Sequence, residues 1–342
     1  MKLFFILSGE HPTLPRSEVK AILESEGVKY RVLNVFPHVL RIDAPLESCD
    51  LVYRRASMTL QCCRELFISS ADYHEIYNCC KDVDWSFIYG KTYAVRVKRV
   101  EGSSPHLSTR ILEREIGAII YRNVFSKAKV NLVNPEVLIQ GIITNDKFLL
   151  GISMKTIRRG VFELRRPKYR PFFHPSSLDA IISRLFVNLS RAKPGSIFLD
   201  PFCGAGGFLI EAYLIGCHVI GLDIDSKMIS GAKINLKYFN VHPLALIHGD
   251  ARNLPFRRID AIATDPPYGR SASTRGERLE LLIKEFLCDA KVILNRNGCM
   301  CIASPSTLNL EDLAKSAGFK VEELHLMRVH KSLTRIIAVL KH

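Results

Sequence analysis

The residues best suited to chemistry in this chain are Asp265, Pro266, Pro267 and Tyr268, which directly follow an apolar run over residues 259–264. The run predicts a short buried strand, and two prolines must end it because neither has an N–H group to donate to a sheet. A carboxylate, bare carbonyl groups and an aromatic ring are then left at the carboxyl end of the strand, where open α/β sheets bind ligands. The oxygens can accept hydrogen bonds from a bound group, and the ring offers a flat face for stacking.

A turn that only closes a strand is the simpler interpretation of the two prolines, so the neighbouring sequence has to decide. Residues 196–199 predict a strand, residues 200–207 a glycine-rich turn, and residues 208–214 the start of a helix. Glycines let the backbone approach a ligand, and a helix N-terminus presents free N–H groups. The turn lacks the G-x-G-x-x-G spacing of nicotinamide-dependent oxidoreductases, which are the competing class.

Acids follow the ends of four predicted strands, of which the second and third cover residues 218–222 and 244–247. These acids are Asp200, Asp223, Asp250 and Asp265. Any one of them could be a solvated loop residue, but four in succession indicate one binding edge. Asp223 lies about twenty residues after the glycine turn, the spacing at which an acid binds ribose hydroxyls in dinucleotide folds.

The proline motif resembles the [Asp/Asn]-Pro-Pro-[Tyr/Phe] motif of S-adenosylmethionine-dependent amino-methyltransferases, which methylate a nitrogen conjugated to a planar system. The resemblance implies that Asp265 or the Pro266 carbonyl accepts a hydrogen bond from the target amine and pulls it toward tetrahedral geometry. Asp265 would also take the departing proton, and Tyr268 would stack on the base. The expected catalytic residues are Asp265, Pro266, Pro267 and Tyr268.

S-adenosylmethionine is the cofactor that this resemblance implies, and no metal is needed. The turn from Asp200 to Gly206 would cradle its amino-acid end, Asp223 would hold the ribose hydroxyls and Asp250 the adenine amino group. The full set of expected cofactor-binding residues is His174, Asp200, Pro201, Cys203, Gly204, Gly206, Asp223, Ile224, Asp250, Ala251 and Asp265.

The N-terminal half has a different pattern. Residues 1–60 alternate predicted strands and helices and indicate a small α+β module, and residues 66–69 predict a further strand. Residues 72–155 resemble the THUMP domain of RNA-modifying enzymes. The stretches that carry the resemblance are 92–99, which alternates apolar and basic residues so that Arg96 and Lys98 share one face, 108–117, which predicts a helix, and 129–135, which predicts a strand. The resemblance implies that this module grips the acceptor end of tRNA.

Positive charge is in excess throughout the chain. The net charge is +14, with 48 Lys and Arg against 34 Asp and Glu, which favours a polyanionic partner. Between Lys155 and Arg170 there are seven basic residues and one acid, with glycine and prolines that indicate a linker. A solvated connector is the alternative to RNA contact there, and also for the arginines of residues 270–278. The expected RNA-binding residues are Arg96, Lys98, Arg158, Arg159, Arg165 and Arg166.

Taken together, nearly the whole chain resembles the archaeal-type tRNA guanosine-10 N2-methyltransferases, including residues 172–179, which look like that family's cofactor-lid motif. The implied fold is an α/β Rossmann-like methyltransferase domain with a seven-stranded mixed sheet, preceded by an α+β module and a THUMP domain. The expected divisions are residues 1–60 for the module, 61–153 for THUMP, 154–175 for a basic linker and 176–342 for the methyltransferase domain. The related guanosine-6 family typically has Asn at the position of Asp265.

Other functions remain open at this point. Amino-methyltransferases of DNA adenine or protein glutamine share the proline motif, but they have no use for a THUMP-like half. A tRNA-binding protein with a vestigial site would have lost acids or glycines, and none is lost here. The implied product is N2-methylguanosine in tRNA, with N2,N2-dimethylguanosine as a further possibility.

Compartment and partners follow from simpler signals. No run approaches about 20 apolar residues, and no cleavable signal opens the chain, so we expect a cytoplasmic protein that binds no membrane. The ten cysteines lack C-x-x-C spacing and are expected to be buried thiols, with a disulfide between the pairs at 62–63 and 79–80 as the alternative. The strand at residues 244–247 is expected at an open sheet edge, where a small zinc-binding activator protein could pair.

Overall fold

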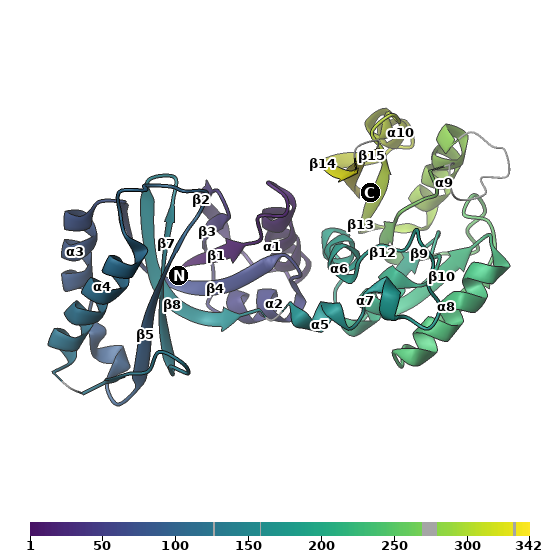
Figure 1. Ribbon diagram of the computed structural model, residues 1–342. Coiled ribbons are helices and arrows are strands. Elements are labelled where there is room, and N and C mark those ends of the chain that lie inside the picture. Colours follow the sequence, from purple (N-terminus) through teal and green to yellow (C-terminus); the bar gives the residue numbers. More distant parts are fainter. Residues whose placement is uncertain (126, 158, 269–278, 331–332) are drawn as a thin grey trace. The chain divides into compact units, whose positions relative to one another are not determined.

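The computed structural model describes residues 1–125, 127–157, 159–268, 279–330 and 333–342, which fall into two compact units (Figure 1). One unit contains Met1–Arg16, Val28–Arg54 and Thr59–Arg158. The other contains Ser17–Gly27, Arg55–Met58 and Arg159–His342. Two short N-terminal segments therefore belong to the unit that is built mainly from the C-terminal half.

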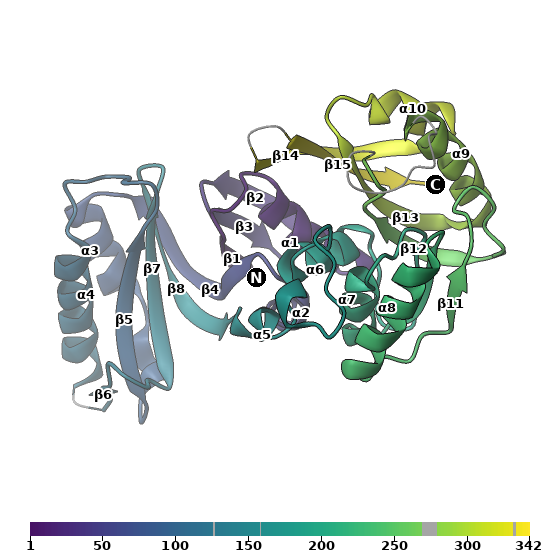
Figure 2. The ribbon, with the colours of Figure 1, turned by 45° about the vertical axis from the view of Figure 1, so that its right-hand side comes forward.

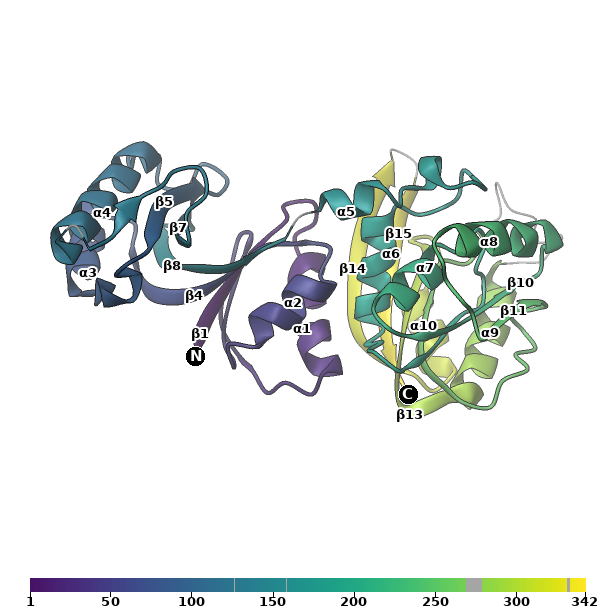
Figure 3. The same ribbon diagram turned by 90° about the horizontal axis from the view of Figure 1, so that it is seen from below.

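An eight-stranded sheet forms the first unit, in the order β2-β3-β1-β4-β8-β7-β5-β6. Its strands are β1 (Lys2–Leu7), β2 (Arg31–Phe36), β3 (Val39–Asp43), β4 (Thr59–Ser70), β5 (Thr92–Arg99), β6 (Lys129–Val130), β7 (Val137–Thr144) and β8 (Lys147–Thr156). Helices α3 (Tyr73–Asp82), η1 (Trp85–Ile88) and α4 (Thr109–Val124) bury apolar side chains against β5, β7 and β8 (Figure 3). Helices α1 (Leu14–Ser25) and α2 (Ser48–Arg55) complete the N-terminal elements.

Two elements of this half differ from the sequence-based expectation. The strand predicted at residues 66–69 is much longer, since β4 runs from Thr59 and pairs with both β1 and β8. The division expected after residue 60 therefore falls inside β4. Residues 131–135 do not continue a strand, because the Asn131 side chain accepts hydrogen bonds from the N–H groups of Val133 and Asn134 and forms a turn.

A seven-stranded mixed sheet forms the second unit, in the order β11-β10-β9-β12-β13-β15-β14. Its strands are β9 (Ile197–Asp200), β10 (His218–Asp223), β11 (Ala245–His248), β12 (Ile259–Thr264), β13 (Leu294–Pro305), β14 (Lys320–His330) and β15 (Leu333–Lys341). The first five strands along that order are parallel, and β15 is antiparallel to both of its neighbours. This confirms the expected Rossmann-like fold class.

Helices cover both faces of this sheet (Figure 2). Helices α6 (Ala180–Leu189), α7 (Gly207–Leu214) and α8 (Ser226–Tyr238) lie on one face, and α9 (Leu279–Ile293) and α10 (Leu310–Ser316) lie on the other. The short α5 (Gly160–Glu163) and η2 (Pro167–Tyr169) precede α6. Because each parallel strand is followed by a helix that returns to the opposite end of the sheet, all their carboxyl ends meet at one edge.

The segment before α6 is fixed to helix α8. The Asn235 amide nitrogen donates to the carbonyls of Phe172 and Ala205, both at 2.9 Å, and the Asn235 carbonyl accepts from the Phe172 N–H at 2.9 Å. The Phe172 ring lies so close to Gly231 that a Cβ there would come within 2.2 Å of it. The absence of a side chain at Gly231 therefore lets this segment reach the glycine-rich turn.

This contact gives a matched pair of substitutions. Replacing a helical glycine with alanine normally stabilises a helix by up to about 1 kcal/mol, and we expect that gain for Gly117→Ala in α4, where the added methyl meets no atom within 4 Å. Gly231→Ala should instead destabilise the second unit by about 1–3 kcal/mol, because the Phe172 ring must move. Scanning calorimetry of the two variants measures both effects, and stabilisation by Gly231→Ala would contradict the packing described.

Candidate active site

The structure brings the four predicted acids together at the carboxyl edge of the second sheet. Asp200 and Asp223 are the last residues of β9 and β10, while Asp250 and Asp265 follow β11 and β12. Across the sheet their order is Asp250, Asp223, Asp200 and Asp265, as the strand order requires. The edge is therefore strongly acidic and suits a cationic ligand.

Asp200 lies at the centre of this row and is 1% exposed. Its Oδ1 accepts hydrogen bonds from the Thr264 hydroxyl at 2.9 Å and from the Phe202 N–H at 3.2 Å. Burial raises the pKa of Asp200 to about 8, and the charges of Asp223 and Asp265 act in the same direction, while the two hydrogen bonds oppose the rise. A positive group bound beside Asp200 would favour its ionised form.

Asp223 holds the glycine-rich turn in place. Its Oδ2 accepts from the Gly204 N–H at 2.8 Å, and its Oδ1 accepts from the Asp225 N–H at 2.9 Å. Gly204 and Gly206 have φ angles of +48° and +83°, which only glycine adopts readily. Each carboxylate oxygen keeps further acceptor capacity, so Asp223 can also bind hydroxyl groups.

The remaining expected cofactor residues line the same turn and strand ends. Cys203 and Pro201 are buried in the turn, and burial raises the pKa of the Cys203 thiol well above its usual value, which argues against a nucleophile. Asp250 is paired with Arg252, whose Nη2 lies 2.6 Å from Oδ2. The Ile224 carbonyl lies 2.9 Å from His248 Nε2.

Ala251 and His174 complete that set. Ala251 is buried behind Asp250. His174 lies two residues after Phe172, and its Nδ1 lies 2.7 Å from the Ser176 hydroxyl. The tie between Asn235, Phe172 and Ala205 therefore keeps the His174 segment beside the turn.

The Asp265 carboxylate belongs to an ion pair that the sequence did not reveal. Arg335 of β15 places Nη2 3.1 Å from Asp265 Oδ2, and its Nε donates to the Tyr268 hydroxyl at 3.0 Å. The Tyr268 hydroxyl donates to Asp265 Oδ1. Burial raises the pKa of Asp265, whereas the positive charge of Arg335 and the hydrogen bond from Tyr268 lower it. Arg335 thus favours the ionised form of a carboxylate that burial would otherwise tend to protonate.

The residues expected to bind RNA have several kinds of surroundings. Arg96 and Lys98 lie on the same face of β5, where Arg96 Nη2 donates to the Leu132 carbonyl at 2.7 Å and Lys98 is exposed. Arg166 pairs with Glu163 at 3.0 Å and with Asp179 at 3.1 Å, and each of these three side chains is more than a third exposed. Arg159 is half-buried next to α5.

Arg165 has a partner that its place in a basic run did not suggest. Its Nε lies 2.6 Å from Oε1 of Glu211, which is fully buried on α7, and its own side chain is 15% exposed. This geometry gives Arg165 a structural role within the second unit. Arg158 and the arginines of residues 270–278 lie outside the described residues.

All ten cysteines are free thiols, so the alternative disulfide between the pairs at 62–63 and 79–80 is not formed. Burial raises the pKa of Cys62, Cys63 and Cys80. These residues pack as small apolar side chains in the first unit.

A cofactor that joins a sulfonium, an ammonium and a ribose fits this edge, because buried carboxylates attract the cations and Asp223 can accept from the hydroxyls. The fold and the site thus define a S-adenosylmethionine-dependent methyltransferase. Residues 167–337 match the family model described as the RMKL-like methyltransferase domain, and residues 70–153 match the THUMP domain.

The chain belongs to the family of the tRNA (guanine(10)-N2)-dimethyltransferases. It is 39% identical over 342 residues to the protein of that name from Methanothermobacter thermautotrophicus, covering 100% of this chain and 99% of the relative. It is 24% identical over 368 residues to the tRNA (guanine(6)-N2)-methyltransferase of Methanocaldococcus jannaschii, covering 93% of this chain and 92% of that protein. The crystal structure of TrmN from Thermus thermophilus shares the fold, with a TM-score of 0.54 and 20% identity over 100% of both chains.

The ion pair at Asp265 gives a pH-dependent prediction. In Arg335→Met the charge that lowers the pKa of Asp265 is gone, so this pKa rises and the acidic limb of the pH–rate profile moves to higher pH. We expect methyl transfer to fall by about 10- to 100-fold at neutral pH and to recover partly at alkaline pH.

Single-turnover rates across the pH range measure this effect. Arg335→Lys should keep more activity than Arg335→Met because it keeps the charge. Arg328→Met, on an exposed position of neighbouring β14, is the control. A uniform loss at every pH, or an unchanged profile, would contradict a role of Arg335 in the ionisation of Asp265.

Proposed function

We propose that this chain transfers methyl groups to the exocyclic N2 of guanosine 10 in tRNA, forming N2-methylguanosine and then N2,N2-dimethylguanosine. The observation that carries the proposal is the position of Asp265. Its carboxylate stands at the end of β12, beside two prolines without N–H groups, and Arg335 holds it. Guanosine 10 and the second methylation rest on the family rather than on this geometry.

Reactivity at this amine requires help from the protein, because the lone pair of N2 is delocalised into the guanine ring. The Asp265 carboxylate or the Pro266 carbonyl accepts a hydrogen bond from the amine and draws it toward tetrahedral geometry, so that its lone pair can attack. S-adenosylmethionine supplies the electrophilic methyl group on its sulfonium. Positioning of this kind contributes up to about 7–11 kcal/mol for well-oriented reactants.

Asp265 then takes the proton that leaves the methylated amine, as a general base worth about 10²–10⁴-fold in rate. Both of its oxygens already have partners, Arg335 and Tyr268, but each oxygen can accept more than one hydrogen bond. After one transfer N2 still carries a hydrogen atom, so the same residues can act a second time. The ring of Tyr268 would stack against the guanine.

We propose the expected cofactor residues as the binding site, from His174 through the turn to Ala251. Arg96, Lys98, Arg158, Arg159 and Arg166 are the proposed RNA contacts, together with the THUMP domain. The divisions of the chain expected from its sequence are kept as a proposal. No helix in the described ranges is both long enough and apolar enough to cross a membrane; a cytoplasmic location is a proposal.

An activator protein at the sheet edge also stays a prediction. Strand β11 pairs with β10 alone within the described residues and so lies at the edge. Leu244, just before it, is 59% exposed, and Leu246 is half-buried. These features allow strand addition by a partner but do not identify one.

The modified position is tested with three tRNA transcripts, one natural, one with adenosine at position 10 and one with adenosine at position 6. We expect both methylated guanosines in the natural and position-6 transcripts and neither in the position-10 transcript. Mass spectrometry of the digested nucleosides after incubation with S-adenosylmethionine measures the products. Loss of product from the position-6 transcript alone would favour the guanosine-6 activity, and methylation of DNA or protein alone would contradict the proposal.

A further inference from the structure

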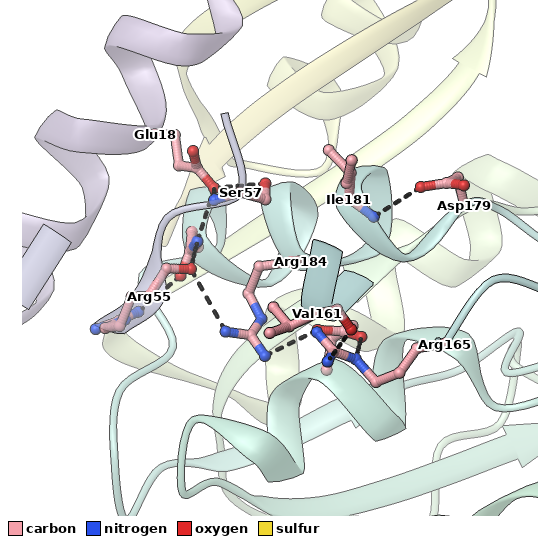
Figure 4. Close-up of polar contacts among 10 residues, drawn as sticks. Glu18, Arg55, Ser57, Val161, Arg165, Asp179, Ile181 and Arg184 are labelled. Carbon is pink, nitrogen blue, oxygen red and sulfur yellow. Dashed lines mark hydrogen bonds and ion pairs between the residues drawn. The ribbon is translucent and has the colours of Figure 1, made fainter. Parts of the chain in front are cut away.

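A buried cluster of arginines surrounds one carboxylate on the outer side of α7. Glu211 is fully buried, and it pairs with Arg165 Nε at 2.6 Å and with Arg184 Nη2 at 2.8 Å. Figure 4 shows the side chains of Arg165 and Arg184 converging from the linker and from α6. One carboxylate therefore faces two guanidinium groups before any third cation is considered.

Arg170 is the third cation of this cluster. It is 5% exposed, and its Nε donates to the Arg165 carbonyl at 3.0 Å. Neither Nη1 nor Nη2 of Arg170 has a hydrogen-bond partner within the described part of the chain. Burial of this guanidinium lowers the pKa of Arg170, and Glu211 and Asp179 only partly oppose that effect. A buried cation with unpaired donors is strongly unfavourable, so a bound anion is expected to complete the site.

The unpaired nitrogens of Arg170 lie at the N-terminus of α7. Nη1 is 3.2 Å and Nη2 is 3.8 Å from the point where a Cβ on Gly207 would stand. Gly206 precedes the helix and offers no side-chain cap to its first turn. The bonds from Asn235 to Phe172 and Ala205 hold the Arg170 segment against the glycine-rich turn. A guanidinium group and free helical N–H groups thus meet beside the turn.

We propose that Arg170 and the first turn of α7 bind the carboxylate of the cofactor's methionine moiety. This assignment rests on the proposed function and adds a residue to it. An amino-acid end carries an ammonium and a carboxylate on one carbon, and the edge offers acids at Asp200 and Asp223 for the first and Arg170 for the second. The planar fork of arginine binds a carboxylate through two parallel hydrogen bonds. The deep burial of Arg170 disfavours an RNA phosphate as the ligand.

The test compares two ligands that differ only by this group, S-adenosylmethionine and its decarboxylated analogue, by titration calorimetry on the full chain. We expect the wild-type chain to bind S-adenosylmethionine about 10- to 100-fold more tightly than the analogue. Arg170→Met should lose about that factor for S-adenosylmethionine and change by less than about threefold for the analogue. Lys168→Met, an exposed cation two residues away, is the matched control and should keep the wild-type preference.

A second variant covers the case in which Arg170→Met does not fold. Gly207→Ala keeps every charge and places a methyl group 3.2 Å from Arg170 Nη1, so it should weaken S-adenosylmethionine more than the analogue. Equal affinity of the wild-type chain for both ligands would overturn this assignment and leave the proposed function intact. Loss of tRNA binding in Arg170→Met with an unchanged ligand preference would also overturn it, in favour of a phosphate. Failure of the wild-type chain to bind S-adenosylmethionine would contradict the proposed function itself.

Discussion

The ion pair between Asp265 and Arg335 is the interaction on which the active edge depends. A carboxylate at 12% exposure would tend to take up a proton, and a protonated acid accepts a target amine poorly and cannot remove its proton. Arg335 reaches it because β13 pairs with β12 on one side and with antiparallel β15 on the other. The register places Arg335 opposite Pro305, at the same edge where β12 stops. The antiparallel strand is thus part of the site as well as of the fold.

A second group of buried charges fixes the elements around the cofactor turn. Glu18 of α1 accepts from the N–H groups of Ser57 and Met58, both at 2.8 Å, and from the Asn188 side chain of α6 at 2.9 Å (Figure 4). The Arg184 guanidinium, one turn earlier on α6, pairs with Glu211 of α7. Networks of this kind favour a single arrangement, because each unpaired buried group would be costly. They explain why short segments near residues 17–27 and 55–58 belong to the second unit.

Sequence reasoning found the parts of the site that depend on local pattern. The strand before Asp265 matches β12 at residues 259–264, and the four acids meet because parallel strands with returning helices leave no other outcome. The seven-stranded mixed sheet was also expected and is confirmed. Glycines at 204 and 206 were recognised as turn residues, and both have positive φ angles.

What was missed depends on contacts between residues far apart in the chain. Nothing near Arg335 marks it as the partner of an acid 70 residues earlier, since only the strand order β12-β13-β15 brings them together. Arg165 and Arg170 were grouped with exposed linker cations because a basic run is typical of solvent, but Glu211 lies beneath them as an isolated acid in an apolar helix. The length of β4 was missed because its pairing with β1 and β8, rather than its composition, extends it.

The central claim is that the Asp265 carboxylate acts in the methyl-transfer step and not in binding. Single-turnover transfer of labelled methyl groups to tRNA by Asp265→Ala, with cofactor and tRNA affinities measured separately, tests it most directly. The account predicts a rate at least about 100-fold lower, with both affinities within a few-fold of the wild-type values. Turnover close to that of the wild-type chain would remove Asp265 from the mechanism.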